Sequence, residues 1–325
     1  MAKTLFAFQD QPPQVLDKAC ALRNAGWAEN PMIPAWVNPE TVSLDRIFTR
    51  PSVAEKCYNN LLRVMLEDHA ETRHYTFVDP SAGDGVFYDL LPPDHRTGIE
   101  LVPGRSDFVC QDFLTWKPSD DRPRYAVIGN PPFGYRAWLA LAFVNHAATF
   151  ADYIGMILPM GFQSNGKGSP KFRVRGAELV NTMDLPSDAF VTPEGKGVQI
   201  NALWQVWRRG VNNRKPVSTC REWVELFTID RRKERLCGQD RLGRADWLLQ
   251  RTFYNTPPTL VTDFRDVKYG CGYGVIIRKD KPGVTAALRN ADWREHSNLA
   301  AHNCRHISME HIQAALVEAG FVDAA

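Results

Sequence analysis

The sequence contains, at residues 125–134, the run Tyr-Ala-Val-Ile-Gly-Asn-Pro-Pro-Phe-Gly. Its first five residues are apolar and partly β-branched, which is typical of a buried strand. Two prolines then prevent a helix or a sheet ladder from continuing, and Pro131 forces Asn130 into an extended conformation. We therefore expect Asn130 at the carboxyl end of a strand, on a stiff turn. That edge of an open α/β sheet is where ligands bind.

The chemistry of this turn suits an amine. The side-chain oxygen of Asn130 and the carbonyl of Pro131 are both hydrogen-bond acceptors, so together they could hold both hydrogens of an exocyclic NH2 group. Phe133 adds a flat apolar face on which a planar ring could stack. The four-residue run alone fits equally well a proline turn with Phe133 in the core, so the preceding sequence has to decide between the two.

A second informative run lies upstream, at residues 75–88: Tyr-Thr-Phe-Val-Asp-Pro-Ser-Ala-Gly-Asp-Gly-Val-Phe-Tyr. It predicts a strand, a tight glycine loop and a helix, because glycine lets the backbone approach a ligand closely and adopt positive φ. The run lacks the G-x-G-x-x-G spacing of dinucleotide-binding loops and is not a phosphate-binding P-loop. Asp79, at the end of the strand, suits a cationic ligand better than a pyrophosphate.

Two further strand ends carry side chains that could contact a ligand. A second strand should end at Glu100, roughly 20 residues after Asp79, where a carboxylate can reach ribose hydroxyls. A third strand, around residues 106–110, precedes Asp112, which could accept from an adenine amino group, and Phe113, which could cover the ring. Singly, these carboxylates would fit a solvated surface. As a phased set at successive strand ends they favour a ligand site.

The remaining periodicity completes an α/β pattern. Pro51 suits a first helical position, and the residues after it form an apolar stripe at helical spacing, Val53, Cys57, Leu61 and Met65. We further expect helices at 14–24, at 135–150 and from the cap Ser308 to Ala319, and strands at 153–159, 179–184, 199–207 and within 269–278.

Length and composition limit the organisation. At 325 residues we expect an N-terminal arm at 1–43, a main domain at 44–209 and a separate region at 210–325. The net charge of +2 is small, so an anionic partner has to be met by a local patch. Seven scattered cysteines without a Cys-x-x-Cys pair favour a reducing compartment and argue against disulfides or structural zinc. No run is long and apolar enough to span a membrane.

Basic residues gather in two places that could contact phosphates. A charged run is often only a solvated face, but cations interleaved with aromatic rings favour nucleic acid. The residues are Lys167, Lys171 and Arg173 in the first place, and Arg231, Arg232, Lys233 and Arg235, followed by Trp247, Phe253 and Tyr254, in the second.

The runs at 79–87 (Asp-Pro-Ser-Ala-Gly-Asp-Gly-Val-Phe) and 130–133 (Asn-Pro-Pro-Phe), in this order, resemble the motifs of S-adenosylmethionine-dependent amino-methyltransferases. More narrowly, the chain resembles DNA N6-adenine methyltransferases with a C-terminal recognition region, as in restriction-modification or phage DNA modification. The segment Asp-Arg-Ile-Phe-Thr-Arg-Pro at 45–51 is similar to the N-terminal helix motif of that group. The resemblance covers residues 44–208, and the two ends of the chain match no family that we can name.

The resemblance implies a Rossmann-like class I methyltransferase fold: a mostly parallel seven-stranded sheet with helices on both faces, plus a smaller C-terminal α+β region that binds DNA. It implies a cytoplasmic enzyme of bacteria or phage, a monomer or weak dimer. Such an enzyme methylates N6 of a flipped-out adenine in double-stranded DNA by direct in-line attack. The catalytic residues would be Asn130, Pro131, Pro132 and Phe133, with no metal. S-adenosylmethionine would contact Phe48, Thr49, Asp79, Pro80, Ser81, Gly83, Gly85, Glu100, Asp112, Phe113 and Asn130.

Other interpretations remain open at this point. The same chemistry could act on RNA adenine, cytosine N4 or a protein glutamine amide, because each presents a planar NH2 group. The basic C-terminal region argues against glutamine, and for cytosine N4 a serine would be commoner than Asn130. An inactive nucleic-acid-binding protein is disfavoured by the intact Asn130, Asp79 and Glu100. A nicotinamide oxidoreductase is disfavoured by the missing dinucleotide fingerprint.

Overall fold

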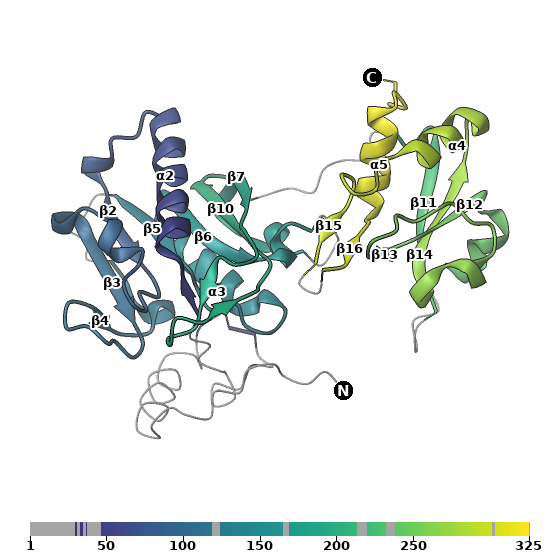
Figure 1. Ribbon diagram of the computed structural model, residues 1–325. Coiled ribbons are helices and arrows are strands. Elements are labelled where there is room, and N and C mark those ends of the chain that lie inside the picture. The colour runs from purple at the N-terminus through teal and green to yellow at the C-terminus, as the bar shows by residue number, and fades with distance from the viewer. Residues whose placement is uncertain are drawn as a thin grey trace. The chain divides into compact units, whose positions relative to one another are not determined.

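The computed structural model of the chain describes residues 30, 33, 34, 37, 47–118, 124–164, 169–212, 220–231, 238–300 and 303–324. The helix expected at 14–24 lies outside them. The chain divides into two compact units: one contains Met1–Phe162 and Pro170–Asn213, the other Gln163–Ser169 and Arg214–Ala325 (Figure 1). Within the described residues, no helix has the length and apolarity needed to cross a membrane.

The first unit is built on one seven-stranded sheet (Figure 1). In chain order its strands are β2 (Thr76–Asp79), β3 (Arg96–Glu100), β4 (Val109–Cys110), β5 (Tyr125–Gly129), β6 (Tyr153–Pro159), β7 (Ala177–Asp184) and β10 (Ala202–Arg209). Side by side they follow β4-β3-β2-β5-β6-β10-β7. Neighbours pair in parallel, except that β10 runs antiparallel to β6 and to β7.

This strand order identifies the fold. If the seven strands are counted 1 to 7 along the chain, their order across the sheet is 3-2-1-4-5-7-6, with the seventh antiparallel. That is the order of the class I methyltransferase fold, so the expected fold class is confirmed. The order reverses between β2 and β5, which is where ligands bind in open α/β sheets.

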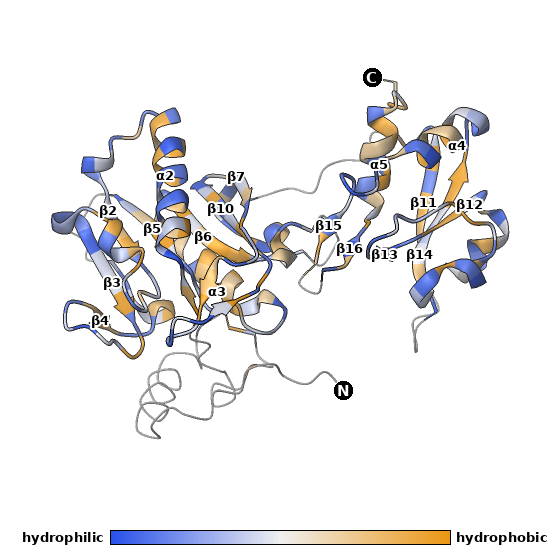
Figure 2. Cartoon of the chain, in the orientation of Figure 1, coloured by the Kyte–Doolittle hydropathy of each residue, from blue (hydrophilic) through white to orange (hydrophobic). Residues whose placement is uncertain are grey.

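Both faces of the central strands are covered. Every residue of β5 is buried, and Figure 2 draws β5 and β6 as largely hydrophobic. Ala126 and Ile128 belong to the same core cluster as helix α2 (Pro51–Glu67). Val127 between them is equally buried, and it points to the opposite face. A strand enclosed on both sides in this way is typical of a parallel sheet.

Helix α2 begins at Pro51 as expected. Its Asn60 side chain accepts a hydrogen bond from the indole nitrogen of Trp204, at 3.0 Å, which fixes the helix to β10. The apolar stripe also faces the core as expected, with buried Val53, Cys57, Leu61 and Met65.

Helix α3 (Trp138–Ala147) is shorter than the expected 135–150. It begins late because Gly134, Arg136 and Ala137 have φ of 66°, 54° and 63°, in the left-handed region. For a non-glycine residue this conformation costs about 1–2 kcal/mol. The strained segment directly follows the Asn-Pro-Pro-Phe turn.

The expected helix after the glycine loop is wrong. The structure has only a 3₁₀ turn there, Tyr88–Leu90. Pro92 and Pro93 follow almost at once, and a helix cannot continue through them, so only one turn fits. The third strand is also shorter than expected, because β4 pairs over two residues at the sheet edge.

A small antiparallel sheet brings the N-terminal side of α2 to the carboxyl edge of the large sheet. Strand β1 (Phe48–Thr49) pairs with β8 (Phe190–Val191), which pairs with β9 (Gly197–Val198). Arg50 strengthens this contact because its Nε atom donates to the carbonyl of Asp188 at 2.7 Å. Residues far apart in the chain are thereby placed side by side.

The second unit contains two antiparallel sheets of three strands each. The first sheet has the strand order β11-β14-β12 and consists of β11 (Val224–Asp230), β14 (Cys271–Ile277) and β12 (Trp247–Gln250). In the order β13-β16-β15, the second is formed by β13 (Thr252–Phe253), β16 (Arg305–His306) and β15 (Asn298–Leu299).

Two helices share a core with β14 in this unit. Helix α4 (Lys281–Asn290) contributes Val284, and α5 (Met309–Glu318) contributes Leu316. The expected strand within 269–278 is present as β14, and α5 agrees with the expected final helix. Its cap is Ser308, whose hydroxyl accepts from the backbone N–H of His311 at 3.3 Å.

The packing of β6 against β10 gives a test of the core. A Cβ atom on Gly155 would lie 2.5 Å from Cζ2 of the buried Trp204. We expect Gly155→Ala to lower the free energy of unfolding by about 1–3 kcal/mol, measured by urea denaturation of the full chain. Gly104→Ala is the control, because no described heavy atom lies within 4 Å of its Cβ position. Equal effects of the two substitutions would contradict this packing.

Candidate active site

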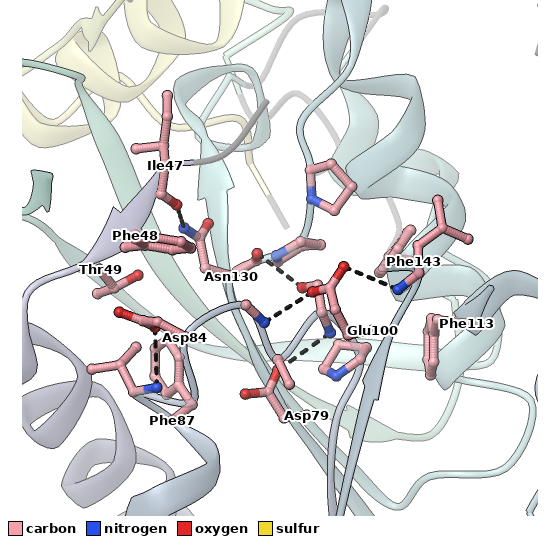
Figure 3. A pocket seen from close by; sticks show the side chains of 18 of the residues that line it. Ile47, Phe48, Thr49, Asp79, Asp84, Phe87, Glu100, Phe113, Asn130 and Phe143 are labelled. Carbon is pink, nitrogen blue, oxygen red and sulfur yellow. Dashed lines mark hydrogen bonds between the residues drawn. The ribbon is translucent and has the colours of Figure 1, made fainter. Parts of the chain in front are cut away.

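A cavity of about 360 Å³ lies at the carboxyl ends of β2, β3 and β5 (Figure 3). Of these strands, β2 and β5 flank the point where the strand order reverses. The volume is in the range of sites for small molecules. The predicted site residues that line it are Phe48, Thr49, Asp79, Pro80, Ser81, Gly83, Glu100, Asp112, Phe113, Asn130, Pro131, Pro132 and Phe133.

The glycine loop brings the main chain against an aromatic ring. Gly83 has a φ of 55°, and a Cβ atom there would lie 3.3 Å from the ring of Phe48. Glycine therefore meets both the conformational and the spatial requirement. Gly85, the other glycine of the motif, has a φ of 94° but lies beside the guanidinium of Arg105 and not in the cavity wall.

Glu100 joins the end of β3 to the glycine loop. Its Oε2 accepts a hydrogen bond from the backbone N–H of Gly83, and its Oε1 from that of Leu101, each at 2.9 Å (Figure 3). These bonds fix the carboxylate before any ligand arrives. Each carboxylate oxygen can accept more than one hydrogen bond, so Glu100 can still accept from ligand hydroxyls.

The Asn-Pro-Pro-Phe turn is held at two atoms of Asn130 (Figure 3). The main-chain carbonyl of Asn130 accepts from the hydroxyl of Ser81 at 2.9 Å, and Nδ2 of Asn130 donates to the carbonyl of Ile47 at 3.5 Å. Because the amide nitrogen is directed at Ile47, Oδ1 is the side-chain atom that can accept from a ligand. Pro131 and Phe133 line the same cavity.

Asp112 and Phe113 are positioned by local contacts. Oδ1 of Asp112 accepts from the backbone N–H of Leu114 at 2.9 Å and caps a 3₁₀ turn. The Phe113 ring lies against those of Phe143 and His146, with centroid distances of 5.1 and 4.9 Å. Phe113 is only 2% exposed, so it offers the cavity a small, well-fixed part of its surface.

Burial dominates the electrostatics of Asp79. The residue is 1% exposed and accepts a hydrogen bond from the backbone N–H of Ser81 at 3.3 Å. Loss of hydration raises the pKa of Asp79 to about 8, and the nearby carboxylates of Glu100 and Asp84 act in the same direction. A positive charge in the cavity would favour the ionised form. The site is therefore suited to a cationic ligand.

Thr49 contributes a buried hydroxyl. The residue is 3% exposed, and its Oγ1 has no hydrogen-bond partner among the described residues. A buried polar group without a partner costs about 1–3 kcal/mol. A polar ligand group that reached Thr49 would recover this free energy.

Several lining residues were not anticipated from the sequence. Leu139 and Phe143 come from α3, and their helical spacing could have identified them as one face of that helix. Phe190 lines the cavity because β8 pairs with β1. No local signal marks it, since the partner strand lies far away in the chain.

The predicted DNA-binding residues are described only in part. Lys171 and Arg173 lie on a 3₁₀ turn (Pro170–Arg173), where burial lowers the pKa of Lys171. Arg231 is exposed at the end of β11, and none of the three lines the cavity. Outside the described residues lie Lys167, Arg232, Lys233 and Arg235.

One of the three aromatic residues expected to face nucleic acid does not do so. Phe253 is 1% exposed and lies in the core of the second unit. Trp247 is half-buried, and its Nε1 donates to the hydroxyl of Thr285 at 2.9 Å. The expectation was wrong for Phe253, which is buried in the core cluster of the second unit, and it stays a prediction for Trp247, which is only partly buried against that cluster. Tyr254, in contrast, is 49% exposed.

The comparisons with known proteins concern the fold alone. No protein-family model matches the chain, and no curated protein sequence matches it. Among solved structures, it is similar to a protein of Thermoplasma acidophilum, with 18% identity, a TM-score of 0.32, and coverage of 50% of this chain and 87% of that one. The M protein of the type I restriction enzyme EcoKI has 18% identity and a TM-score of 0.35, with coverage of 54% and 47%.

A third similar structure is a Pyrococcus horikoshii protein that is provisionally described as an RNA methyltransferase. It has 18% identity and a TM-score of 0.36, with coverage of 62% of this chain and 100% of that one. The chain therefore spans about half of the EcoKI subunit but all of this third protein.

The raised pKa of Asp79 predicts a pH-dependent stability. The carboxyl is neutral in the folded, ligand-free protein up to a pKa of about 8 but ionises near 3.8 when unfolded. The stabilising contribution is therefore complete below pH 3.8 and is lost as the pH rises through about 8. Asp79→Asn should gain stability relative to the wild type over this interval, by at most about 1.4 kcal/mol per pH unit. Urea unfolding between pH 5 and pH 9 tests this, and a constant difference would contradict it.

Proposed function

We propose that the chain is an S-adenosylmethionine-dependent methyltransferase that acts on the exocyclic N6 of adenine in DNA. The observation that carries the proposal is that one cavity is lined by the 130–133 turn and by Asp79, Gly83 and Glu100. An amine-binding turn and a cofactor-binding loop thus share one space. Direct transfer between two bound molecules needs this proximity.

The lining residues fit the chemical groups of the cofactor. Glu100, already fixed by two backbone N–H groups, suits the ribose hydroxyls. Asp112 and Phe113 suit the adenine ring and its amino group. The charged methionine part would suit the buried carboxyl of Asp79 and the hydroxyl of Thr49, which has no partner among the described residues. When bound, S-adenosylmethionine supplies a methyl group on a sulfonium ion: an amine nitrogen can attack it in line, the sulfur–methyl bond breaks, a neutral thioether leaves, and the methylated nitrogen gives up a proton to solvent.

Asn130 and Pro131 would overcome the weak nucleophilicity of an exocyclic amine, whose lone pair is shared with the ring. Oδ1 of Asn130 and the carbonyl of Pro131 can each accept one of its two N–H hydrogen bonds, which favours a tetrahedral nitrogen. The bonds from Ser81 and to Ile47 hold the turn in place before the substrate binds. The acceptors therefore need little reorganisation during the reaction.

DNA is the substrate that we favour. The chain has a net charge of only +2, but Lys171, Arg173 and Arg231 provide local cations for phosphates. A base inside a duplex cannot reach a cavity at a sheet edge, so the target adenine has to be flipped out, and Phe133 would stack on it.

Radiolabelled S-adenosylmethionine offered separately to duplex DNA, RNA and protein tests the proposed substrate. We expect label in DNA, recovered as N6-methyladenine after digestion. Label confined to RNA or to protein would contradict the DNA substrate, and label on cytosine N4 would contradict the adenine.

The role of Asn130 predicts a loss of turnover without a loss of the cofactor. Asn130→Ala removes one of the two acceptors, so methyl transfer should fall by about 100-fold or more. The dissociation constant for S-adenosylmethionine, measured by calorimetry, should change little. Asn59→Ala is the matched control, because Asn59 is exposed on α2 and lies outside the cavity wall. Retained turnover in Asn130→Ala would exclude the assigned role.

Thr49 allows a test of cofactor binding that does not depend on turnover. Thr49→Val keeps the shape of the side chain but removes the hydroxyl that has no partner among the described residues. We expect about five- to tenfold weaker binding of S-adenosylmethionine and an unchanged or higher stability of the ligand-free protein. Equal affinity in the variant and the wild type would show that the ligand does not reach Thr49.

A further inference from the structure

Two exposed tyrosine rings contact each other on the second unit. Tyr254 is 49% exposed and Tyr269 is 56% exposed, and their ring centroids lie 6.3 Å apart with an interplanar angle of 62°. Tyr254 follows β13, and Tyr269 lies in the turn that leads into β14. Phe253 and Trp293 of the same unit are buried in its core. The two tyrosine rings are therefore exposed to solvent, whereas Phe253 and Trp293 are not.

The backbone is strained at one of these two tyrosines. Tyr269 has φ 63° and ψ 8°, in the left-handed region that is unfavourable for a residue with a side chain. The backbone N–H of Arg231 holds the turn by donating to the carbonyl of Gly270 at 3.0 Å. Strain of this kind is concentrated at sites that bind other molecules.

Three cations lie close to the two tyrosines along the chain or through a backbone hydrogen bond. Arg231 is bonded to the residue after Tyr269, Lys268 precedes Tyr269, and Arg251 lies three residues before Tyr254. All three are exposed, and the guanidinium of Arg231 lies over the ring of Phe264, 5.1 Å from its centroid. The nearby carboxylate of Asp263 is bonded to Arg265. Elsewhere in the unit Glu225 pairs with Arg241, Arg244 and Arg278, and Arg241 also pairs with Asp240.

We propose that Tyr254 and Tyr269, with Arg231, Arg251 and Lys268, form a surface that binds a nucleic-acid strand with unpaired bases. The choice of nucleic acid rests on the proposed function. The rings would stack on bases, and the cations would contact the adjacent phosphates. Stacking needs an accessible face of the base, so the ligand is a single strand or the opened strand of a duplex. We call these five residues the tyrosine surface.

Binding of the full chain to a fluorescein-labelled single-stranded DNA of mixed sequence, followed by fluorescence anisotropy, tests this surface. Tyr254→Ala and Tyr269→Ala should each weaken binding about tenfold, because a base loses its stacking partner. Tyr254→Phe and Tyr269→Phe should bind within about twofold of the wild type, since the ring is retained. Val322→Ala, at another exposed apolar residue of this unit, is the control and should have no effect.

The cations can be tested through salt dependence. Lys268→Gln and Arg251→Gln should each reduce the slope of log affinity against log salt by about 0.7, the value for one phosphate contact on a single strand. Lys279→Gln is the matched control, because Lys279 is bonded to Glu222 at 2.7 Å. It should leave the slope unchanged.

The tyrosine surface is excluded if the alanine variants bind like the wild type, or if the phenylalanine variants lose as much affinity as the alanine variants. The same preparations should be assayed for S-adenosylmethionine binding and methyl transfer to DNA. Methylation of DNA with unchanged strand binding in the alanine variants would refute the tyrosine surface alone. Tyrosine-dependent strand binding without methylation of any nucleic acid would refute the proposed function alone.

Discussion

The arrangement of the cavity depends on the absence of a side chain at Gly129. A Cβ atom there would lie 2.7 Å from Oδ1 of Asp79 and 3.0 Å from Cδ of Pro80. Because β2 and β5 are parallel neighbours, this space lies between their carboxyl ends. Because Gly129 has no side chain, the buried carboxyl of Asp79, at the end of β2, can lie against the end of β5. Gly129 directly precedes Asn130, so this contact is at the start of the Asn-Pro-Pro-Phe turn. The acidic end of β2 and the amide-bearing turn can therefore face one cavity.

The same closeness makes the ligand-free site electrostatically unfavourable. Asp79, Asp84 and Glu100 lie near one another, and burial of Asp79 raises its pKa, so a proton occupies that carboxyl at neutral pH. A cationic ligand would replace the proton. An uncharged amide at this position would avoid the cost of ionising a buried carboxyl, but it would lose the attraction for a positive charge. Such a conflict between stability and binding is common at functional sites.

The parts of the site that could be predicted are those where one short run determines both the structure and the chemistry. Residues 125–133 contain a strand, its termination and the acceptors of the turn, so local rules suffice. The helix expected after the glycine loop failed because Pro92 leaves room for one turn only. Phe190 could not be predicted, since its place depends on a strand pairing with Thr49. Tyr269 has a left-handed backbone conformation, which no periodicity reveals.

The position of β10 between β6 and β7 also has a consequence for synthesis on the ribosome. Among the described strands of this sheet, β7 pairs only with β10, and β10 is translated after it. While residues 177–201 leave the ribosome, β10 has not yet been made, so β7 has no strand with which to pair. The seven residues of β6 then pair with β5 only, and the edge that later pairs with β10 stays open. An open edge exposes unpaired backbone groups that can recruit other chains. A nascent chain that stalled in this interval would already contain nearly all of the residues that line the cavity, but it would also expose an unpaired strand edge that is prone to aggregation.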